Sequence, residues 1–174
     1  MGVDLGTSLR LYKRPEVQQA IVDSAIDKEV AVKYGESGFG KRPDVLLNPL
    51  DVVELAKQKA TSFHCSEELW TNPIKIDTLS KNDNLRKGWD LVIDIDCPFL
   101  EYSQIAGDLI VKALEHHGIK SISVKFSGNH GFHIAVPFEA FPEKVHNVET
   151  KQLFPENHSG YSKFLTNVSF LSKI

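Results

Sequence analysis

The pattern of apolar and polar positions in the second half of the chain predicts a strand, a helix and two more strands. Residues 89–95 form an almost continuous apolar run, which is typical of a strand in a covered sheet. Residues 101–118 carry apolar side chains at helical spacing and end at a glycine, as an amphipathic helix does. The shorter runs 121–126 and 132–138 read as strands on either side of a tight turn at 127–131. We expect the two strands that flank the helix to be parallel and the last strand to fold back as a hairpin. The apolar face of this helix is predicted to contain Ile105, Leu109, Ile110, Ala113 and Leu114.

The first half of the chain predicts a second set of helices and strands. Residues 15–26 and 48–60 are expected to be helices, because each has apolar residues at helical spacing and a proline in its first turn. Residues 29–34 and 61–65 are expected to be strands, and the glycine-rich segment 35–44 is expected to be a loop. Weaker patterns predict loops over 71–87 and 148–160 and a modest helix over 161–174.

Composition places the chain among ordinary globular proteins. It has 174 residues, of which 41% are hydrophobic and 25% charged, and we expect one α/β (α+β) domain over residues 1–174. An N-terminal part, 1–88, would precede a motif-bearing part, 89–142. A net charge of −3 argues against a dedicated nucleic-acid coat protein. Two cysteines, and no apolar run near the ~20 residues of a membrane span, predict a cytoplasmic or nucleoid-associated protein with no membrane partner.

Two carboxylates lie near the end of the apolar run 89–95, one inside the run and one directly after it. Asp94 and Asp96 lie two residues apart, so both are predicted to share one face of the strand, opposite Ile93 and Ile95. A pair of carboxylates at a strand end suits one or two divalent cations that also bind phosphate oxygens. The alternative is structural: Asp96 would cap the turn before Pro98 and Asp94 would form a surface salt bridge.

The segment 127–134 that follows the second strand contains groups that suit phosphate. Gly128 and Gly131 permit positive φ angles and a close approach of ligand to backbone. The Ser127 hydroxyl and the amides of the turn, including those of Asn129 and His130, form a concavity for anions. His133 follows one residue into the next strand, and Lys125 alternates onto the surface of Ser127. A lone strand histidine is more often structural, but one that faces a carboxylate pair is a better candidate for a ligand.

These residues resemble a known family. The segments DLVIDID and ISVKFSGNHGFHIAVPFEAF, separated by one helix, look like the catalytic small subunit of archaeal and eukaryotic DNA primases, in the archaeo-eukaryotic primase superfamily. The upstream segments GFGKRPDVL and TSFHCSEELW are also similar to archaeal members, and the resemblance spans residues 28 to 142.

The resemblance implies an RRM-like mixed sheet flanked by helices and an enzyme that synthesises primers for DNA replication. It assigns catalysis and metal binding, by Mg²⁺ or Mn²⁺, to Asp94 and Asp96. It assigns contacts with the nucleotide phosphates to Ser127 and His133. The partners it implies are a single-stranded DNA template, nucleoside triphosphates and a primase large subunit. The full set expected to bind nucleotide, including two residues of the upstream loop, is Ser127, Gly128, Asn129, His130, Gly131, His133, Lys41 and Arg42.

The sequence departs from the family pattern in three ways. Many relatives have basic residues where this chain has Asn129 and His130. The family's third catalytic acid lies on a later strand, whereas Glu149 and Glu156 are predicted to lie in loops. No compact zinc-binding cluster of cysteines and histidines is visible. The resemblance, with these departures, implies a truncated primase, a divergent short form, or a member that has lost part of its chemistry.

Two other functions remain open. A non-catalytic primase-like domain would bind nucleotide or nucleic acid and recruit a partner. A phosphatase of the haloacid dehalogenase type also has a strand followed by D-x-D and a later strand that ends in serine. That class has no place for the G-F-H-I segment, and its downstream lysine and acidic pair are not found in this chain.

Overall fold

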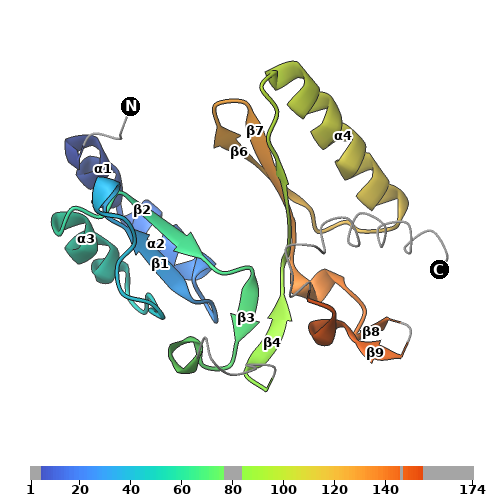
Figure 1. Ribbon diagram of the computed structural model, residues 1–174, viewed down its shortest axis with the longest axis horizontal. Helices are drawn as coiled ribbons and strands as arrows, with labels where there is room; N and C mark the ends of the chain where they lie inside the picture. Colours follow the sequence, from blue (N-terminus) through green and yellow to red (C-terminus); the bar gives the residue numbers. More distant parts are fainter. Residues whose placement is uncertain (1–4, 77–83, 146, 155–174) are drawn as a thin grey trace. The chain divides into compact units, whose positions relative to one another are not determined.

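The computed structural model of the chain is a mixed α/β structure with small antiparallel sheets (Figure 1). It describes residues 5–76, 84–145 and 147–154, and within these ranges it contains four α-helices. The chain divides into two compact units, residues 1–87 and 88–174.

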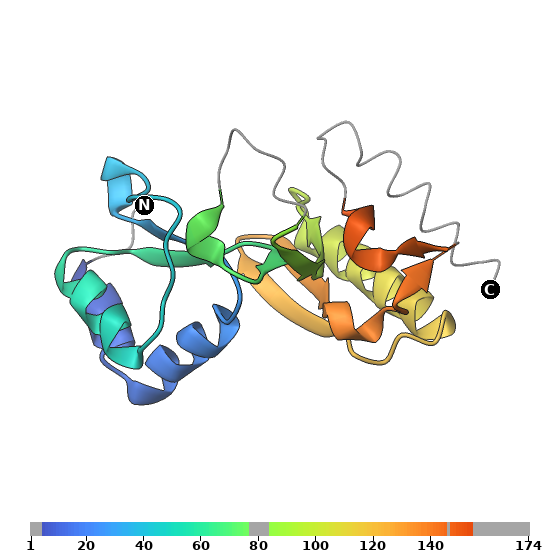
Figure 2. The ribbon, with the colours of Figure 1, turned by 90° about the horizontal axis from the view of Figure 1, so that it is seen from below.

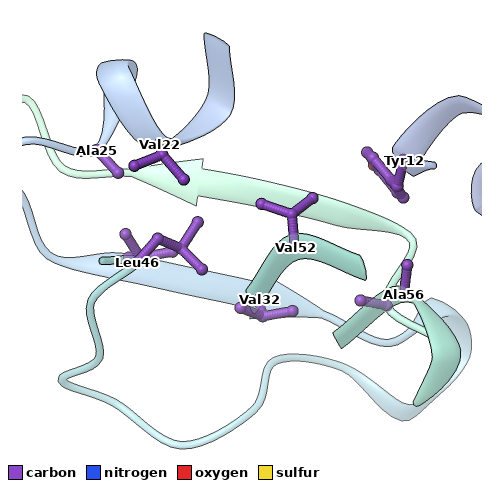
Figure 3. Close-up of a cluster of buried hydrophobic side chains, with 9 residues drawn as sticks. Tyr12, Val22, Ala25, Val32, Leu46, Val52 and Ala56 are labelled. Atoms are coloured by element: carbon purple, nitrogen blue, oxygen red, sulfur yellow. The ribbon is translucent and has the colours of Figure 1, made fainter. Parts of the chain in front are cut away.

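The first unit packs three helices against one side of a two-stranded antiparallel sheet (Figure 2). The close-up in Figure 3 shows the buried side chains between these layers, and Val30 and Val52 of this core have no exposed surface. The second predicted helix begins as expected, because the Asp51 carboxylate accepts a hydrogen bond from the Asn48 N–H at 2.9 Å. The elements are α1 (Leu5–Tyr12), α2 (Pro15–Ser24), β1 (Val30–Lys33), α3 (Pro49–Lys57) and β2 (Ser62–Cys65), with short 3₁₀ turns at Gly35–Ser37 and Pro73–Lys75.

A second small sheet pairs β3 (Glu68–Trp70) with β4 (Arg86–Trp89), and the boundary between the two units falls within β4, after Lys87. The Arg86 guanidinium donates to the Glu68 carboxylate at 2.7 Å and lies 5.5 Å from the centre of the Trp70 ring. The predicted single strand 89–95 is therefore wrong at its start, since β4 ends at Trp89 and β5 begins at Leu91. Asp90 separates them, and its carboxylate accepts a hydrogen bond from the Phe138 N–H at 3.0 Å.

The second unit is built on a three-stranded sheet in the order β5–β7–β6 (Figure 1). Both β5 and β6 are antiparallel to β7, so the two strands that flank the helix run in the same direction, as predicted. The hairpin β6–β7 is also confirmed, and β7 lies between the two parallel strands. The elements are β5 (Leu91–Ile95), α4 (Leu100–His116), β6 (Ser123–Gly128) and β7 (Gly131–Val136), followed by 3₁₀ residues Phe138–Ala140.

Helix α4 packs against one face of this sheet, but not through the whole predicted apolar face. Ile110 and Leu114 join the core, whereas Ile105 and Leu109 are 58% and 61% exposed. Two small buried residues, Ser103 and Gly107, are on the packed side of the helix. A Cβ at Gly107 would lie only 3.6 Å from Ile95 Cδ1, so the helix approaches the sheet closely through small residues. Ile105, Leu109 and the exposed Ala113, on the neighbouring side of the helix, therefore remain outside the core.

The centre of this core provides a test of the packing. Ile134 on β7 is fully buried, and its cross-strand neighbour Val124 on β6 is 55% exposed. We expect Ile134→Ala to lower the free energy of unfolding of this unit by about 2–5 kcal/mol, because it leaves a cavity. The matched change Val124→Ala should cost about 0.5 kcal/mol or less. Chemical denaturation of both variants measures the difference, and equal losses would contradict the burial assigned to β7.

The chain after β7 forms a further small hairpin, β8 (Lys144–Val145) with β9 (Val148–Glu149), and a 3₁₀ segment Thr150–Leu153. The indole N–H of Trp89 donates to the Thr150 carbonyl at 2.9 Å, which attaches this segment to the core. The prediction of a loop at Glu149 is wrong, because this residue pairs with Lys144 in the hairpin. The predicted helix 161–174 and Glu156 lie outside the described residues. No helix in the described ranges is long and apolar enough to cross a bilayer.

Candidate functional site

The strand register places three ionisable side chains in one row across the second unit's sheet. Asp94 on β5 lies opposite His133 on β7, and His133 lies opposite Lys125 on β6. Directly opposed residues in neighbouring strands project to the same face of a sheet. His133 Nε2 lies 3.4 Å from Asp94 Oδ1, and both side chains are partly open to solvent, at 38% and 67% exposure. The row therefore combines a carboxylate, an imidazole and an ammonium group on one accessible surface.

The opposite face of the same strand enters the core, as predicted. Ile93 and Ile95 both pack in the cluster beneath α4. Asp94 consequently faces away from the helix, and Asp96, the first residue after β5, is exposed. Side chains two residues apart on one face are separated by about 7 Å, which leaves room for a ligand between two carboxylates. The structure also contains a contact expected of a purely structural Asp94, because His133 Nε2 lies within salt-bridge distance of its carboxylate.

The turn between β6 and β7 is shorter than predicted. Ser127 and Gly128 belong to β6 and Gly131 to β7, so the connection consists of Asn129 and His130 alone. Gly128 has a φ of 105° and Asn129 a φ of 52°, both in the left-handed region, where glycine and asparagine are the favoured residues. The register shifts between Phe126 and Gly128, which is a bulge immediately beside Ser127.

Gly131 serves a different purpose from Gly128. Its φ is not positive, so the predicted need for conformational freedom is wrong at this position. A Cβ at Gly131 would instead collide with the Ser127 hydroxyl and lie 2.8 Å from the Ile95 carbonyl oxygen. The missing side chain therefore leaves room for both the Ser127 hydroxyl and the Ile95 carbonyl oxygen beside Gly131.

This close approach predicts a large effect for a small substitution. Gly131→Ala should destabilise the second unit by about 1–3 kcal/mol, because the added methyl group overlaps a backbone carbonyl that cannot move freely. Gly107→Ala is the matched control, since its Cβ would make only an ordinary contact and alanine favours a helix by up to about 1 kcal/mol. Thermal unfolding of both variants compares them, and a tolerated Gly131→Ala would contradict the tight junction.

The two basic residues of the upstream loop belong to the first unit. Lys41 is exposed. Arg42 donates two hydrogen bonds of 2.7 Å, from Nε and Nη2, to the two carboxylate oxygens of Glu29. This pairing raises the pKa of the Arg42 guanidinium above its usual value. In this structure the Arg42 side chain therefore neutralises a carboxylate of its own unit, while Asp94, His133 and Lys125 form the row in the other.

The donor set at the row suits a hard divalent cation. Asp94 and Asp96 supply oxygen ligands, and magnesium prefers one or two carboxylates together with water and phosphate oxygens. Within the ranges 5–76, 84–145 and 147–154, no three histidine, cysteine, aspartate or glutamate residues are grouped as a metal site. Glu149 bonds instead to Lys151, with 3.0 Å between the charged atoms.

Lys125 is the site residue whose place sequence reasoning located least well. The alternation in 123–128 indicates that Lys125 and Ser127 share a face, but only the register shows that Lys125 lies opposite His133.

Comparison of the chain with protein-family models and with curated proteins found no match in either.

Proposed function

We propose that this chain is a nucleotidyltransferase of the DNA primase type, which adds nucleotides to a primer on a single-stranded DNA template. The observation that carries the proposal is the row of Asp94, His133 and Lys125, with the Ser127 hydroxyl beside Gly131 at the end of the hairpin. Under this proposal the second unit is a primase small-subunit core with an RRM-like sheet. A primase large subunit is the protein partner that this assignment predicts.

Asp94 and Asp96 are the residues that would hold Mg²⁺ or Mn²⁺. Both side chains are exposed and supply oxygen ligands, which fits these ions. A bound ion of this kind would activate the attacking hydroxyl group and neutralise phosphate charge.

The remaining polar groups of this face would hold the triphosphate. The Ser127 hydroxyl and the backbone N–H groups around Asn129 donate hydrogen bonds to phosphate oxygens, as successive amides in a turn do. His133 in its protonated form and Lys125 add positive charge beside Asp94. This arrangement orients the α-phosphorus toward the 3′-hydroxyl of the growing strand.

The reaction forms one phosphodiester bond and breaks one phosphoanhydride bond. The oxygen of the 3′-hydroxyl attacks the α-phosphorus, the hydroxyl proton is lost to solvent, and pyrophosphate leaves with the electrons of the broken bond. The residues on this face bind and orient the triphosphate for that displacement, and none of them forms a covalent intermediate.

A template-dependent incorporation assay tests the proposal. Labelled nucleotides, a single-stranded template and Mg²⁺ or Mn²⁺ are incubated with the chain, and extended products are separated by length. The proposal predicts products whose composition follows the template. Hydrolysis of a simple phosphomonoester without incorporation would instead support a phosphatase, and nucleotide binding without either reaction would support a non-catalytic domain.

A further inference from the structure

The outer face of the β1–β2 sheet in the first unit carries a second row of side chains. Lys33 on β1 pairs with Ser62 on β2, and on its other side it forms an antiparallel bridge with Phe39. Opposed residues project to the same face, so Phe39, Lys33 and Ser62 stand side by side across three extended segments. The core residues Val32 and Phe63 alternate onto the other face, toward the helices.

His64 extends this row, because it lies two residues after Ser62 and shares its face. The Ser62 hydroxyl and His64 Nε2 are 2.9 Å apart, and the Phe39 and His64 rings contact each other edge to face with centroids 5.2 Å apart. Phe39 nevertheless remains 54% exposed. The surface thus presents a supported aromatic ring to solvent.

Backbone hydrogen bonds fix the position of Phe39 on both sides of its bridge. The Tyr34 N–H donates to the Gly38 carbonyl, and the Gly40 N–H donates to the Val32 carbonyl, each at 2.8 Å. A Cβ at Gly40 would lie 2.9 Å from the Tyr34 ring, so glycine is required where the segment crosses this ring. Phe39 is therefore held against the sheet edge rather than carried on a free loop.

We propose that this outer face, defined by Lys33, Phe39, Ser62 and His64, binds single-stranded nucleic acid. An exposed aromatic ring supported by a second ring is a stacking surface for an unpaired base. The adjacent ammonium group of Lys33, with exposed Lys41 two residues after Phe39, complements the phosphate backbone. An apolar protein partner fits less well, because Phe39 is the one large apolar side chain among these four residues.

The charge nearby sets the expected strength of this interaction. Glu36 is exposed in the same connection, and Arg42 is paired with Glu29, so the proposal assigns phosphate contacts to Lys33 and Lys41. Stacking should therefore supply more of the binding than charge. Two phosphate contacts with a single strand correspond to a slope of log K against log salt of about −1.4.

The proposal is independent of nucleotide transfer, so it is tested without nucleotide and with EDTA to remove divalent ions. Fluorescence anisotropy measures binding of the full chain to a labelled oligothymidylate of about 15 nucleotides and to a duplex of the same length. Phe39→Ala should weaken single-strand binding about tenfold, and Phe39→Trp should retain it. Lys33→Gln should reduce the salt slope by about 0.7. Ile26→Ala, which removes another exposed apolar side chain of this unit, should change nothing.

A second readout reports stacking directly. Trp70 and Trp89 are the two tryptophans of the chain, and both are buried. Because Phe39 is 54% exposed, the indole introduced by Phe39→Trp should report on this face. Its emission should be quenched by the single strand and not by the duplex. Equal affinity of the parent and Phe39→Ala, equal binding of single strand and duplex, or unquenched emission on binding would each overturn the proposal. Dimer formation without DNA that is lost in Phe39→Ala would also overturn the proposal, because this face would then be a contact between two copies of the chain.

Discussion

Asp94→Asn and Asp96→Asn are each expected to reduce template-dependent nucleotide incorporation by roughly 10²–10³-fold. Each change removes one negative charge and one oxygen ligand from the proposed metal-binding pair. The side chains are exposed, so the fold should survive, and losing the contact between Asp94 and His133 should cost about 1 kcal/mol or less. Incorporation kinetics and thermal unfolding on the same preparations separate the two effects.

Asp108→Asn is the matched control for this experiment. Asp108 is an exposed carboxylate of the same unit that pairs with Lys112 on α4, at 2.6 Å between charged atoms. Its replacement should leave incorporation unchanged. If Asp94→Asn and Asp96→Asn were as active as this control, the pair would be a surface salt bridge and a turn cap, and the metal assignment would be wrong.

His133→Ala is expected to raise the KM for the incoming nucleotide about tenfold, with a smaller effect on kcat. The imidazole lies between Asp94 and Lys125 in the row, and under the proposal it would contact the triphosphate in both the bound and the reacting state. Uniform binding of this kind affects KM more than kcat. Initial rates over a range of nucleotide concentrations give both constants.

His116→Ala provides the comparison for His133→Ala, because His116 lies at the exposed C-terminal end of α4. It should have no effect on either constant. An unchanged KM with intact activity in His133→Ala would remove the imidazole from phosphate binding. The proposed row predicts that Lys125→Gln also raises the KM for the incoming nucleotide, and the same rate measurements test this variant.

Strand periodicity was enough to predict which face of β5 carries Asp94, but not which residues lie opposite it. The two-residue period of a strand predicts that Asp94 projects from the face opposite to Ile93 and Ile95. The packing of both isoleucines in the core confirms this prediction. The pairing of Asp94 with His133 was not derivable in detail, because it depends on β7 inserting between β5 and β6. Register is fixed by hairpin length and by the bulge beside Ser127, and neither is readable from composition.

The fold was predicted least well where small residues decide the packing. The helical pattern of 101–118 is correct as a helix, but Gly107 and Ser103 place its contact with the sheet one stripe away from Ile105 and Leu109. Asp90 breaks the apolar run because its carboxylate bonds to the Phe138 backbone, a contact between residues far apart in sequence. Local patterns report periodicity, whereas these outcomes depend on tertiary contacts.

Elements with few residues were also missed. Helix α1, Leu5–Tyr12, and strand β3, Glu68–Trp70, are too short for a strong periodic pattern. Strand β3 owes its place to the Arg86–Glu68 pair and to the stacking of Arg86 on Trp70. Those contacts join residues 18 and 16 positions apart, so neither is visible in the local sequence.

Nucleotide-dependent uptake of Mn²⁺ tests the central claim most directly, because it requires the site and not the complete reaction. Electron paramagnetic resonance measures free Mn²⁺ in the presence of a non-hydrolysable nucleoside triphosphate and the chain. We predict that the parent takes up Mn²⁺ with the nucleotide, and that a variant combining Asp94→Asn with Asp96→Asn binds it at least about tenfold more weakly. Equal uptake by the parent and this double variant would contradict the assignment of Asp94 and Asp96 as the metal-binding pair.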